Sequence, residues 1–266
     1  MVRTIPQLCA SVAGRPSPLG VLIHEAGYRA AGLDFRYVAI GSERLDETVH
    51  SLVALGVRGF GVSMPFKADV IELLDSVSPD VQSIGACNTV VNDEGKLTGH
   101  NTDWRGAMDA LEAAGIRPPG RAVVLGSGGV ARALVFGLRD KGWEVAILAR
   151  NAITGREVAD QFELQPPLSF DQSTYPSFDL VVNATPLSEY PVPMLNLERF
   201  PDARYIFDVI FSPLKTPLCA EAERRGLRVV RGWEMLLRQA MHQFELYTGV
   251  SAPFEVMRDT LVNNLK

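Results

Sequence analysis

The sequence predicts an α/β protein built from two domains with largely parallel sheets. Three observations support this fold class. The chain has 266 residues, which fits two compact domains better than one. Short apolar runs typical of buried strands alternate with helical patterns along the whole chain. A run of glycines and prolines at 115–120 interrupts this alternation and is the candidate joint by composition.

The first half is expected to alternate between strand and helix and then to form a hairpin. Strands are expected at 7–13, 35–40 and 59–64, and helices at about 20–31, 43–55 and 66–74. Pro65 lacks a backbone N–H and should stop the third strand. The segments 88–92 and 96–100 flank the turn residues Asp93-Glu94-Gly95, which predicts the hairpin. Asp103 is expected to cap a helix that runs to about residue 114.

The alternation resumes after residue 120 and predicts a second parallel sheet. Strands are expected at 122–125, 144–149, 180–182, 205–209 and 228–230, and helices at 130–140 and 154–163. The C-terminal stretch is expected to be helical, because apolar residues recur at helical spacing from Met235 to Tyr247.

Composition and charge exclude several classes of protein. Hydrophobic residues make up 47% of the chain, which excludes a disordered protein, and a net charge of −5 without Lys/Arg-rich runs argues against nucleic-acid binding. The three cysteines are widely spaced and the four histidines show no ligand spacing, so neither a disulfide scaffold nor a metal site is expected. No signal peptide or membrane span is recognisable. We therefore expect a cytoplasmic protein that acts on a small molecule.

A glycine-rich turn in the second half has the pattern of a dinucleotide site. The apolar strand that ends at Leu125 is followed by Gly126, Gly128 and Ala131, which match the spacing G-x-G-x-x-G/A. The first glycine permits a tight turn, the second lets a pyrophosphate approach the backbone, and the small third residue permits close packing. The anion would bind the free N–H groups at the helix start. The alternative is a turn that needs glycine for structural reasons alone.

The end of the next expected strand favours NADP over NAD. NAD enzymes carry an Asp or Glu about 20 residues past the glycines, where it binds the ribose 2′-OH. Here the strand ends at Arg150 and Asn151, with Arg156 further on, and no acid stands at its end. A guanidinium suits the 2′-phosphate of NADP, because its planar donors are permanently charged. The alternative is that Arg150 is a solvated charge at a strand end.

Two isolated ionisable residues in the first half, Lys67 and Asp103, follow expected strands, where α/β sheets place their ligands. A dehydrogenase that oxidises an alcohol must remove the hydroxyl proton as the hydride leaves. A desolvated lysine can accept that proton while a carboxylate orients the hydroxyl. From the residues alone, a surface lysine and a helix-capping aspartate are the simpler interpretation.

Seven motifs occur in order along the chain. They are Val62-Ser63-Met64-Pro65-Phe66-Lys67, Ile84-Gly85-Ala86-Cys87-Asn88-Thr89-Val90, Gly99-His100-Asn101-Thr102-Asp103, Leu125-Gly126-Ser127-Gly128-Gly129, Asn183-Ala184-Thr185-Pro186-Leu187, Asp208-Val209-Ile210-Phe211-Ser212-Pro213 and the segment 232–239. Together they resemble the shikimate dehydrogenase family over essentially the whole chain. The resemblance implies a substrate-binding domain that faces a Rossmann-type NADP domain across a cleft. Residues 1–103, completed by C-terminal helices at 232–266, would form the first domain, and residues 104–231 the second.

The resemblance also implies a role for each matching residue. Lys67 would be the catalytic base, and Asp103 would hold the substrate hydroxyl beside it. Hydroxyl groups of the substrate would bind Ser63, Asn88 and Gln239, and its carboxylate would bind Ser17. Arg15, although it departs from the family pattern, can hold a carboxylate through a bidentate charge-assisted pair. NADP would be bound by Gly126, Ser127, Gly128, Gly129, Val130, Ala131, Arg150 and Asn151, with Val209 and Gly232 near the nicotinamide. Seen alone, Ser17 fits a helix cap, Asn88 the opening of the hairpin, and Gln239 an exposed helix position.

The pattern departs from the family mainly around the substrate. Arg15 stands where the family has the first serine of Ser-x-Ser-Pro, Gly61 and Ser63 replace an asparagine and a threonine, and Phe211 replaces a tyrosine. The chain thus resembles the divergent shikimate dehydrogenase-like subgroup. A substrate group left unpaired costs about 1–3 kcal/mol. We therefore expect slow oxidation of shikimate, or a related cyclic hydroxy acid as the true substrate.

Two alternatives stay open. An NAD-dependent quinate/shikimate dehydrogenase is one, and the absence of an acid near Arg150 argues against it. A catalytically weak NADP-binding sensor is the other, and the presence of both Lys67 and Asp103 argues against it. The protein is expected to be a monomer or a homodimer that binds neither nucleic acid nor membrane.

Overall fold

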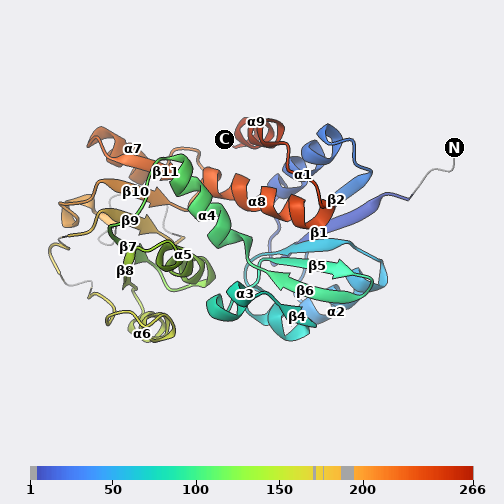
Figure 1. Ribbon diagram of the computed structural model, residues 1–266, viewed down its shortest axis with the longest axis horizontal. Helices are drawn as coiled ribbons and strands as arrows, with labels where there is room; N and C mark the ends of the chain where they lie inside the picture. Colours follow the sequence, from blue (N-terminus) through green and yellow to red (C-terminus); the bar gives the residue numbers. More distant parts are fainter. Residues whose placement is uncertain (1–4, 170–171, 176, 187–194, 266) are drawn as a thin grey trace. The chain divides into compact units, whose positions relative to one another are not determined.

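A computed structural model describes residues 5–169, 172–175, 177–186 and 195–265 (Figure 1). The chain divides into two compact units. The first comprises Met1–Thr102 and Gln239–Asn264, and the second comprises Asp103–Arg238 and Leu265–Lys266. No helix among the described residues is long and apolar enough to cross a membrane. Both sheets are largely parallel and alternate with helices, which confirms the predicted α/β class.

The loop at 115–120 lies inside the second unit, so it is not the joint that its composition indicated. The preceding helix, α4 (Thr102–Ala113), explains this, because Ala107 and Leu111 are buried in the core of the second unit. The chain passes from one unit to the other between Thr102 and Asp103. The expected division of labour between substrate and cofactor stays a prediction.

The first unit contains a six-stranded sheet in the order β2-β1-β3-β5-β6-β4. Its strands are β1 (Gln7–Ala13), β2 (Phe35–Gly41), β3 (Gly59–Val62), β4 (Ser76–Val77), β5 (Thr89–Asp93) and β6 (Lys96–His100). Strand β5 is antiparallel to both neighbours, and the other pairs are parallel. The predicted hairpin is therefore confirmed as β5–β6. Because β5 runs against β3, it begins at the edge of the sheet where β1 and β3 end.

The helix predicted at 66–74 is wrong, because this segment forms only the 3₁₀ helix η1 (Asp69–Leu73). Its last turn closes an i to i+3 bond from the N–H of Leu74 to the carbonyl of Ile71. The next N–H, that of Asp75, donates to a carbonyl of β6, and β4 follows directly. The chain must rejoin the sheet at once, which leaves no room for a longer helix.

The helix α3 (Pro79–Ile84) was not predicted, although its sequence carries two signals. A proline occupies its first turn, and Gly85 ends it with a φ of 69°. The helix has six residues and is too short to show an apolar period.

Different helices cover the two faces of this sheet. Phe60 of β3 is buried in an apolar core together with α2 (Leu45–Ala54). At Gly59 a side chain would point to the opposite face of the sheet, and there the backbone lies against Tyr247 of α8 (Gly232–Thr248). A Cβ at Gly59 would lie 2.4 Å from the Tyr247 ring, so only glycine permits this approach.

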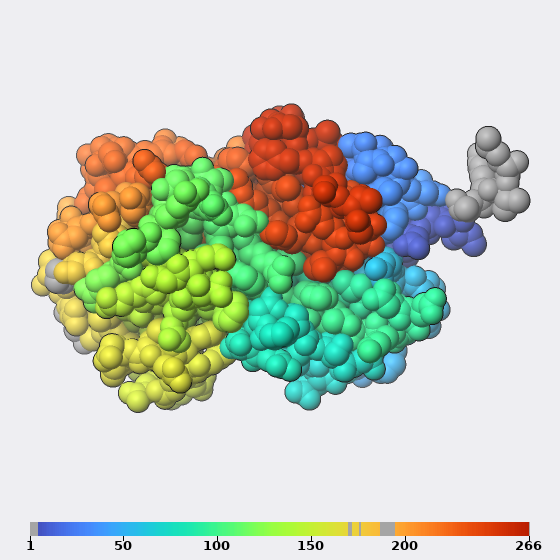
Figure 2. Space-filling view, in the orientation of Figure 1, coloured from blue at the N-terminus to red at the C-terminus, as the bar shows by residue number. Residues whose placement is uncertain are grey.

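The two ends of the sequence pack together in the first unit. Helices α1 (Leu19–Ala30) and α9 (Phe254–Asn264) lie side by side (Figure 1). Figure 2 shows the C-terminal residues in red against the N-terminal residues in blue. Gly27 of α1 permits the approach, because a Cβ there would already lie 3.2 Å from Met257. The helical C-terminus is confirmed as α8 and α9, which are separated at Gly249 with its φ of 74°.

His24 of α1 is fully buried among aromatic rings. It lies parallel to Tyr37, with 4.3 Å between ring centroids. Burial lowers the pKa of His24 to about 4, and the side chain of Gln243, which faces the ring, only partly opposes this effect. The ring is therefore neutral near pH 7 and contributes packing. Within the described part of the chain, no three His, Cys, Asp or Glu side chains are grouped to hold a metal ion.

The second unit contains a parallel five-stranded sheet in the order β11-β10-β9-β7-β8. Its strands are β7 (Arg121–Leu125), β8 (Glu144–Leu148), β9 (Leu180–Asn183), β10 (Tyr205–Asp208) and β11 (Arg228–Arg231). A parallel bridge between Leu148 and Leu168 extends the sheet past β8. With that bridge counted as a short strand, the order is the 3-2-1-4-5-6 of the Rossmann fold, which confirms the predicted topology.

Helices surround this second sheet. They are α4, α5 (Gly129–Asp140), α6 (Ala152–Gln161), the 3₁₀ helix η3 (Leu197–Arg199) and α7 (Pro217–Arg224). Helix α7 was not predicted, although Pro217 stands at its start and the Thr216 hydroxyl accepts the N–H of Cys219 at 3.2 Å. Helix α4 begins at Thr102, so Asp103 lies in its first turn and not at the cap position that the sequence indicated.

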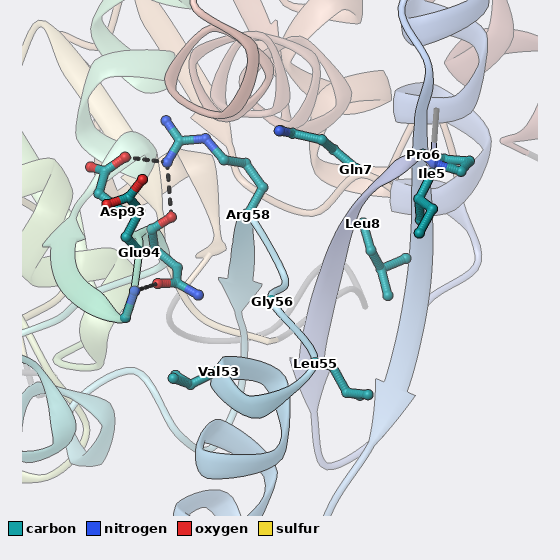
Figure 3. Close-up of a pocket in the computed structure, with 12 residues that line it drawn as sticks. Ile5, Pro6, Gln7, Leu8, Val53, Leu55, Gly56, Arg58, Asp93 and Glu94 are labelled. Carbon is teal, nitrogen blue, oxygen red and sulfur yellow. Dashed lines mark hydrogen bonds and ion pairs between the residues drawn. The ribbon is translucent and has the colours of Figure 1, made fainter. Parts of the chain in front are cut away.

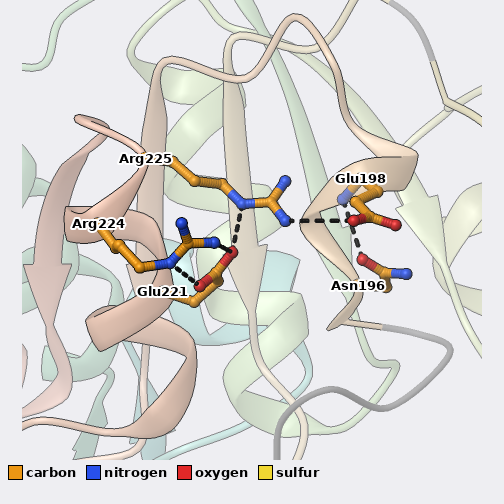
Figure 4. A network of polar contacts seen from close by, with 5 residues as sticks. All are labelled: Asn196, Glu198, Glu221, Arg224 and Arg225. Atoms are coloured by element: carbon orange, nitrogen blue, oxygen red, sulfur yellow. Dashed lines mark hydrogen bonds and ion pairs between the residues drawn. The ribbon is translucent and has the colours of Figure 1, made fainter.

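An exposed ion-pair network links α7 with η3 (Figure 4). Glu221 accepts hydrogen bonds from Arg224 and Arg225, and Arg225 lies 3.7 Å from Glu198. The hydrogen bond from Arg224, and to a lesser extent that from Arg225, lowers the pKa of Glu221 to about 2. Because exposed ion pairs contribute little to stability, we assign this network no functional role.

Candidate active site

The glycine turn between β7 and α5 has the shape that a pyrophosphate requires. Gly126 has a φ of 122°, and a Cβ there would lie 2.8 Å from the carbonyl oxygen of Ala184, so the turn needs glycine. Gly128 has an ordinary extended conformation, and a Cβ there would meet no atom within 4 Å. Packing therefore gives no reason for glycine at 128. The space in front of it is open at the start of a 12-residue helix, where N–H groups point outward to bind an anion.

The end of β8 presents one unengaged guanidinium. Arg150 is exposed and has no hydrogen bond or ion pair with any residue that the structure describes. The nearby Arg156 is different, because its Nε bonds both carboxylate oxygens of Asp160 at 2.8 and 3.0 Å. Arg150 is therefore the residue at this strand end that fits a 2′-phosphate.

Asn151 caps α6, since its Oδ1 accepts the N–H groups of Ile153 at 2.9 Å and Thr154 at 3.3 Å. The Thr154 hydroxyl lies 2.7 Å from the hydroxyl of Ser127 in the glycine turn. The two loops that the sequence assigned to NADP are thus joined by a side-chain hydrogen bond.

A buried polar network holds the ends of β9 and β10. The Asp208 carboxylate accepts hydrogen bonds from the Asn183 amide at 2.9 Å and from the Thr216 hydroxyl at 2.6 Å. Burial raises the pKa of Asp208. Asn183 and Asp208 were not singled out as site residues, although each is the last residue of neighbouring parallel strands. The network orders the segment after β10, which begins at Val209.

Val209 and Gly232, which the resemblance assigned to the nicotinamide, lie next to each other. A Cβ at Gly232 would lie 2.3 Å from the carbonyl oxygen of Val209, so a side chain at 232 would displace this backbone. The N–H of Val209 donates to Asn183 at 3.0 Å, which ties the segment to β9. Leu187, the last residue of the Asn-Ala-Thr-Pro-Leu motif, lies outside the described residues.

In the first unit, backbone hydrogen bonds connect the segments that carry the expected substrate residues, at the end of the sheet where β1 and β3 finish. The N–H of Ser63 donates to Val12 at 2.9 Å, and that of Gly14 donates to Met64 at 3.0 Å. The carbonyl of Lys67 accepts the N–H of Cys87 at 2.7 Å. The loop that bears Ser63 and Lys67 is therefore tied to the ends of β1 and to the residue before Asn88.

Asn88 is the centre of a buried amide cluster. Its Oδ1 accepts the N–H of Thr102 at 2.7 Å, and its Nδ2 donates to the Thr102 hydroxyl at 2.9 Å and to Gln239 Oε1 at 3.3 Å. Asn88 is buried and directly precedes β5, so it does open the hairpin, whereas Gln239 is half-buried and is not the exposed helix position that the residues alone permitted. The structure thus brings these two predicted residues together from segments 151 residues apart.

Arg15 and Ser17 lie in the exposed loop before α1. The Ser17 hydroxyl accepts the N–H of Leu19 at 3.2 Å, which is the bond of a residue that starts a helix. Asp103 is buried and is the first residue of the second unit. Its pairing with Lys67 stays a prediction.

Two models of the same protein family match parts of this chain. The model of the shikimate dehydrogenase substrate-binding domain matches residues 16–90, and that of the shikimate 5′-dehydrogenase C-terminal domain matches residues 232–262. A shikimate dehydrogenase (NADP⁺) from Natronomonas pharaonis is 40% identical over 91% of this chain and 93% of its own length. The chain belongs to the shikimate dehydrogenase family. It is an NADP-dependent oxidoreductase.

Two further relatives place the chain within that family. A shikimate dehydrogenase-like protein from Haemophilus influenzae is 34% identical over 93% of both chains, in agreement with the predicted subgroup. The structure of shikimate 5-dehydrogenase from Thermus thermophilus in complex with NADP(H) and shikimate is 32% identical, with a TM-score of 0.86 over 97% of this chain and 99% of the other.

A separate pocket of about 670 Å³ lies at the opposite edge of the first sheet, where β1 begins (Figure 3). Its cation, Arg58, is already engaged by the Asp93 carboxylate and by the carbonyls of Asn92 and Tyr247. Ligands of such sheets bind beyond the carboxyl ends of the parallel strands. The predicted residues Lys67 and Asn88 lie at the other end of the sheet, where this rule expects a ligand, and their role stays a prediction.

Proposed function

We propose that this enzyme oxidises shikimate, or a closely related cyclic hydroxy acid, to the 3-dehydro acid. The observation that carries the proposal is the amide pair of Asn88 and Gln239 at the sheet edge to which the Lys67 loop is tied. Each amide can both donate and accept hydrogen bonds, so the pair suits adjacent hydroxyl groups of a polyhydroxy ring.

In this proposal the two units bind different molecules. The first unit binds the substrate through Ser63, Asn88 and Gln239, and the second holds NADP through the glycine turn from Gly126 to Ala131 and through Arg150. Bound NADP supplies the acceptor for the hydride that leaves the substrate carbon. The hydroxyl group on that carbon gives its proton to Lys67 Nζ. The Asp103 carboxylate orients this hydroxyl group as it becomes a carbonyl.

For the substrate carboxylate we propose Arg15. Its loop follows Gly14, whose N–H is bonded to Met64 in the segment that leads to Lys67. A guanidinium binds a carboxylate through two parallel charge-assisted bonds. The alternative ligand, Ser17, is already engaged, because its hydroxyl oxygen accepts the N–H of Leu19 at the start of α1. This favours Arg15.

The assay that tests the proposal follows absorbance at 340 nm with shikimate and quinate, each with NADP and with NAD. We expect NADPH formation with shikimate at less than about 10 s⁻¹, which is the median turnover number of enzymes. Quinate with NAD is the arm for the rival activity, since a quinate dehydrogenase from Corynebacterium glutamicum in complex with NAD is a structural relative. Silence in all four arms with NADP still bound would contradict oxidation of shikimate, and would leave another cyclic hydroxy acid or a sensor role.

Arg150→Ala is expected to raise KM for NADP by about 10- to 100-fold and to leave KM for NAD unchanged. The physical reason is the loss of a charge-assisted bond to the 2′-phosphate, which is worth about 1.5–3 kcal/mol. Steady-state kinetics with both nucleotides measure the change. Arg156→Ala is the matched control, because that side chain is paired with Asp160. Equal effects of the two substitutions would show that Arg150 acts only through general charge.

A further inference from the structure

Gly61 marks the place where the family pattern has an asparagine and this chain has no side chain. Gly61 lies in β3, between Ser11 of β1 and Thr89 of β5. A Cβ added at 61 would lie 3.1 Å from Gln243 Nε2 and 3.3 Å from the Tyr37 hydroxyl. The space of the missing side chain is therefore occupied by another amide, which comes from α8.

Gln243 reaches this space from the same helix face as Gln239, four residues earlier in α8. Only 6% of Gln243 is exposed. Its Nε2 donates to the main-chain carbonyl of Asn88 at 3.2 Å and to the Thr89 hydroxyl at 3.0 Å. Gln243 thus binds the backbone of Asn88, while the side chain of Asn88 is bonded to Gln239.

We propose that Gln243 is a positioning residue for the substrate amides, and that it replaces from α8 the amide that the family pattern places on β3. This inference rests on the proposed function and deepens it. An amide at 61 and the Gln243 amide compete for one space, so the chain holds one of them. Through the Asn88 carbonyl and Thr89, Gln243 sets the position of the Asn88 side chain, and so the fit of the ring hydroxyls.

A packing role alone does not account for this residue. The Tyr37 hydroxyl and Gln243 Nε2 lie beside the same Cβ position at Gly61, and the His24 ring also faces Gln243, so this buried amide is surrounded by polar groups as well as aromatic rings. A buried amide is tolerated only when its polar atoms are paired, and here the pairing is with Asn88 and Thr89. One of the two residues that accept these bonds, Asn88, is proposed to bind the substrate.

The test combines Gln243→Met, Gln243→Ala, Gly61→Asn and the double variant Gly61→Asn/Gln243→Ala. Gln243→Met keeps the volume and removes the donor, so we expect KM for shikimate to rise about 10-fold while KM for NADP and the melting temperature stay unchanged. Gly61→Asn alone is expected to bind shikimate more weakly still, because its side chain meets Gln243. The double variant is expected to return to within about 3-fold of the parent KM. His242→Ala, on the same helix turn, is the control.

The outcomes separate this inference from the proposed function. If Gln243→Met keeps the parent KM, or if the effects of Gly61→Asn and Gln243→Ala simply add, the inference is overturned. If the parent enzyme is silent on shikimate, the proposed function fails by itself. The same four variants then decide the inference by thermal unfolding: a smaller loss for Gly61→Asn in the Gln243→Ala background supports it, and additive losses overturn it.

Discussion

Lys67→Met is expected to lower kcat for shikimate by about 10²- to 10⁴-fold, which is the contribution of a general base. The substitution keeps the length of the side chain and removes the nitrogen that we propose as the acceptor of the hydroxyl proton. The Lys67 backbone carbonyl, bonded to Cys87, is unaffected, so the loop should keep its place. NADPH formation at 340 nm measures the rate, and a fluorescence titration measures NADP binding, which we expect to be unchanged.

The control for this experiment is Lys96→Met, in which an exposed lysine of the hairpin is removed from the same unit. Its kcat should equal that of the parent. A Lys67→Met enzyme that retains more than about a tenth of the parent kcat would show that another group accepts the proton.

Gly128→Val is expected to weaken NADP binding by at least about 100-fold without loss of fold. A side chain at 128 would enter the open space at the start of α5, because no atom lies within 4 Å of its Cβ. It would keep the pyrophosphate from the N–H groups there, and each charge-assisted bond lost costs about 1.5–3 kcal/mol. A titration with NADP and a melting curve measure the two effects separately.

Gly126→Ala is the contrasting variant. A φ of 122° and a contact of 2.8 Å with Ala184 mean that a Cβ at 126 strains the backbone, so the melting temperature should fall even without NADP. If Gly128→Val lost stability to the same extent as Gly126→Ala, the open space at 128 would have a structural purpose and the nucleotide site would need another location.

Local pattern was enough to predict most strands and the cofactor turn, because their signals lie within a few adjacent residues. Strand β7, the glycines at 126 and 128, and helix α5 follow one another directly. The false helix at 66–74 shows the limit of this reasoning. Its composition permits a helix, but β4 must pair with β6, and that distant pairing sets where the segment ends.

Sequence by itself determined the α/β class, the Rossmann-type second sheet, the family and NADP as the cofactor, because each depends on residue types at short, fixed spacing. Only the tertiary structure decided which residues share the substrate edge. Asn88 meets Gln239 and Gln243 because β5 begins where β3 ends and α8 lies against that face, a relation between segments about 150 residues apart. Spacing along the chain carries no record of such a contact. The proposed role of Gln243 depends on a contact of the same kind, because its amide occupies the space beside Gly61 from another element.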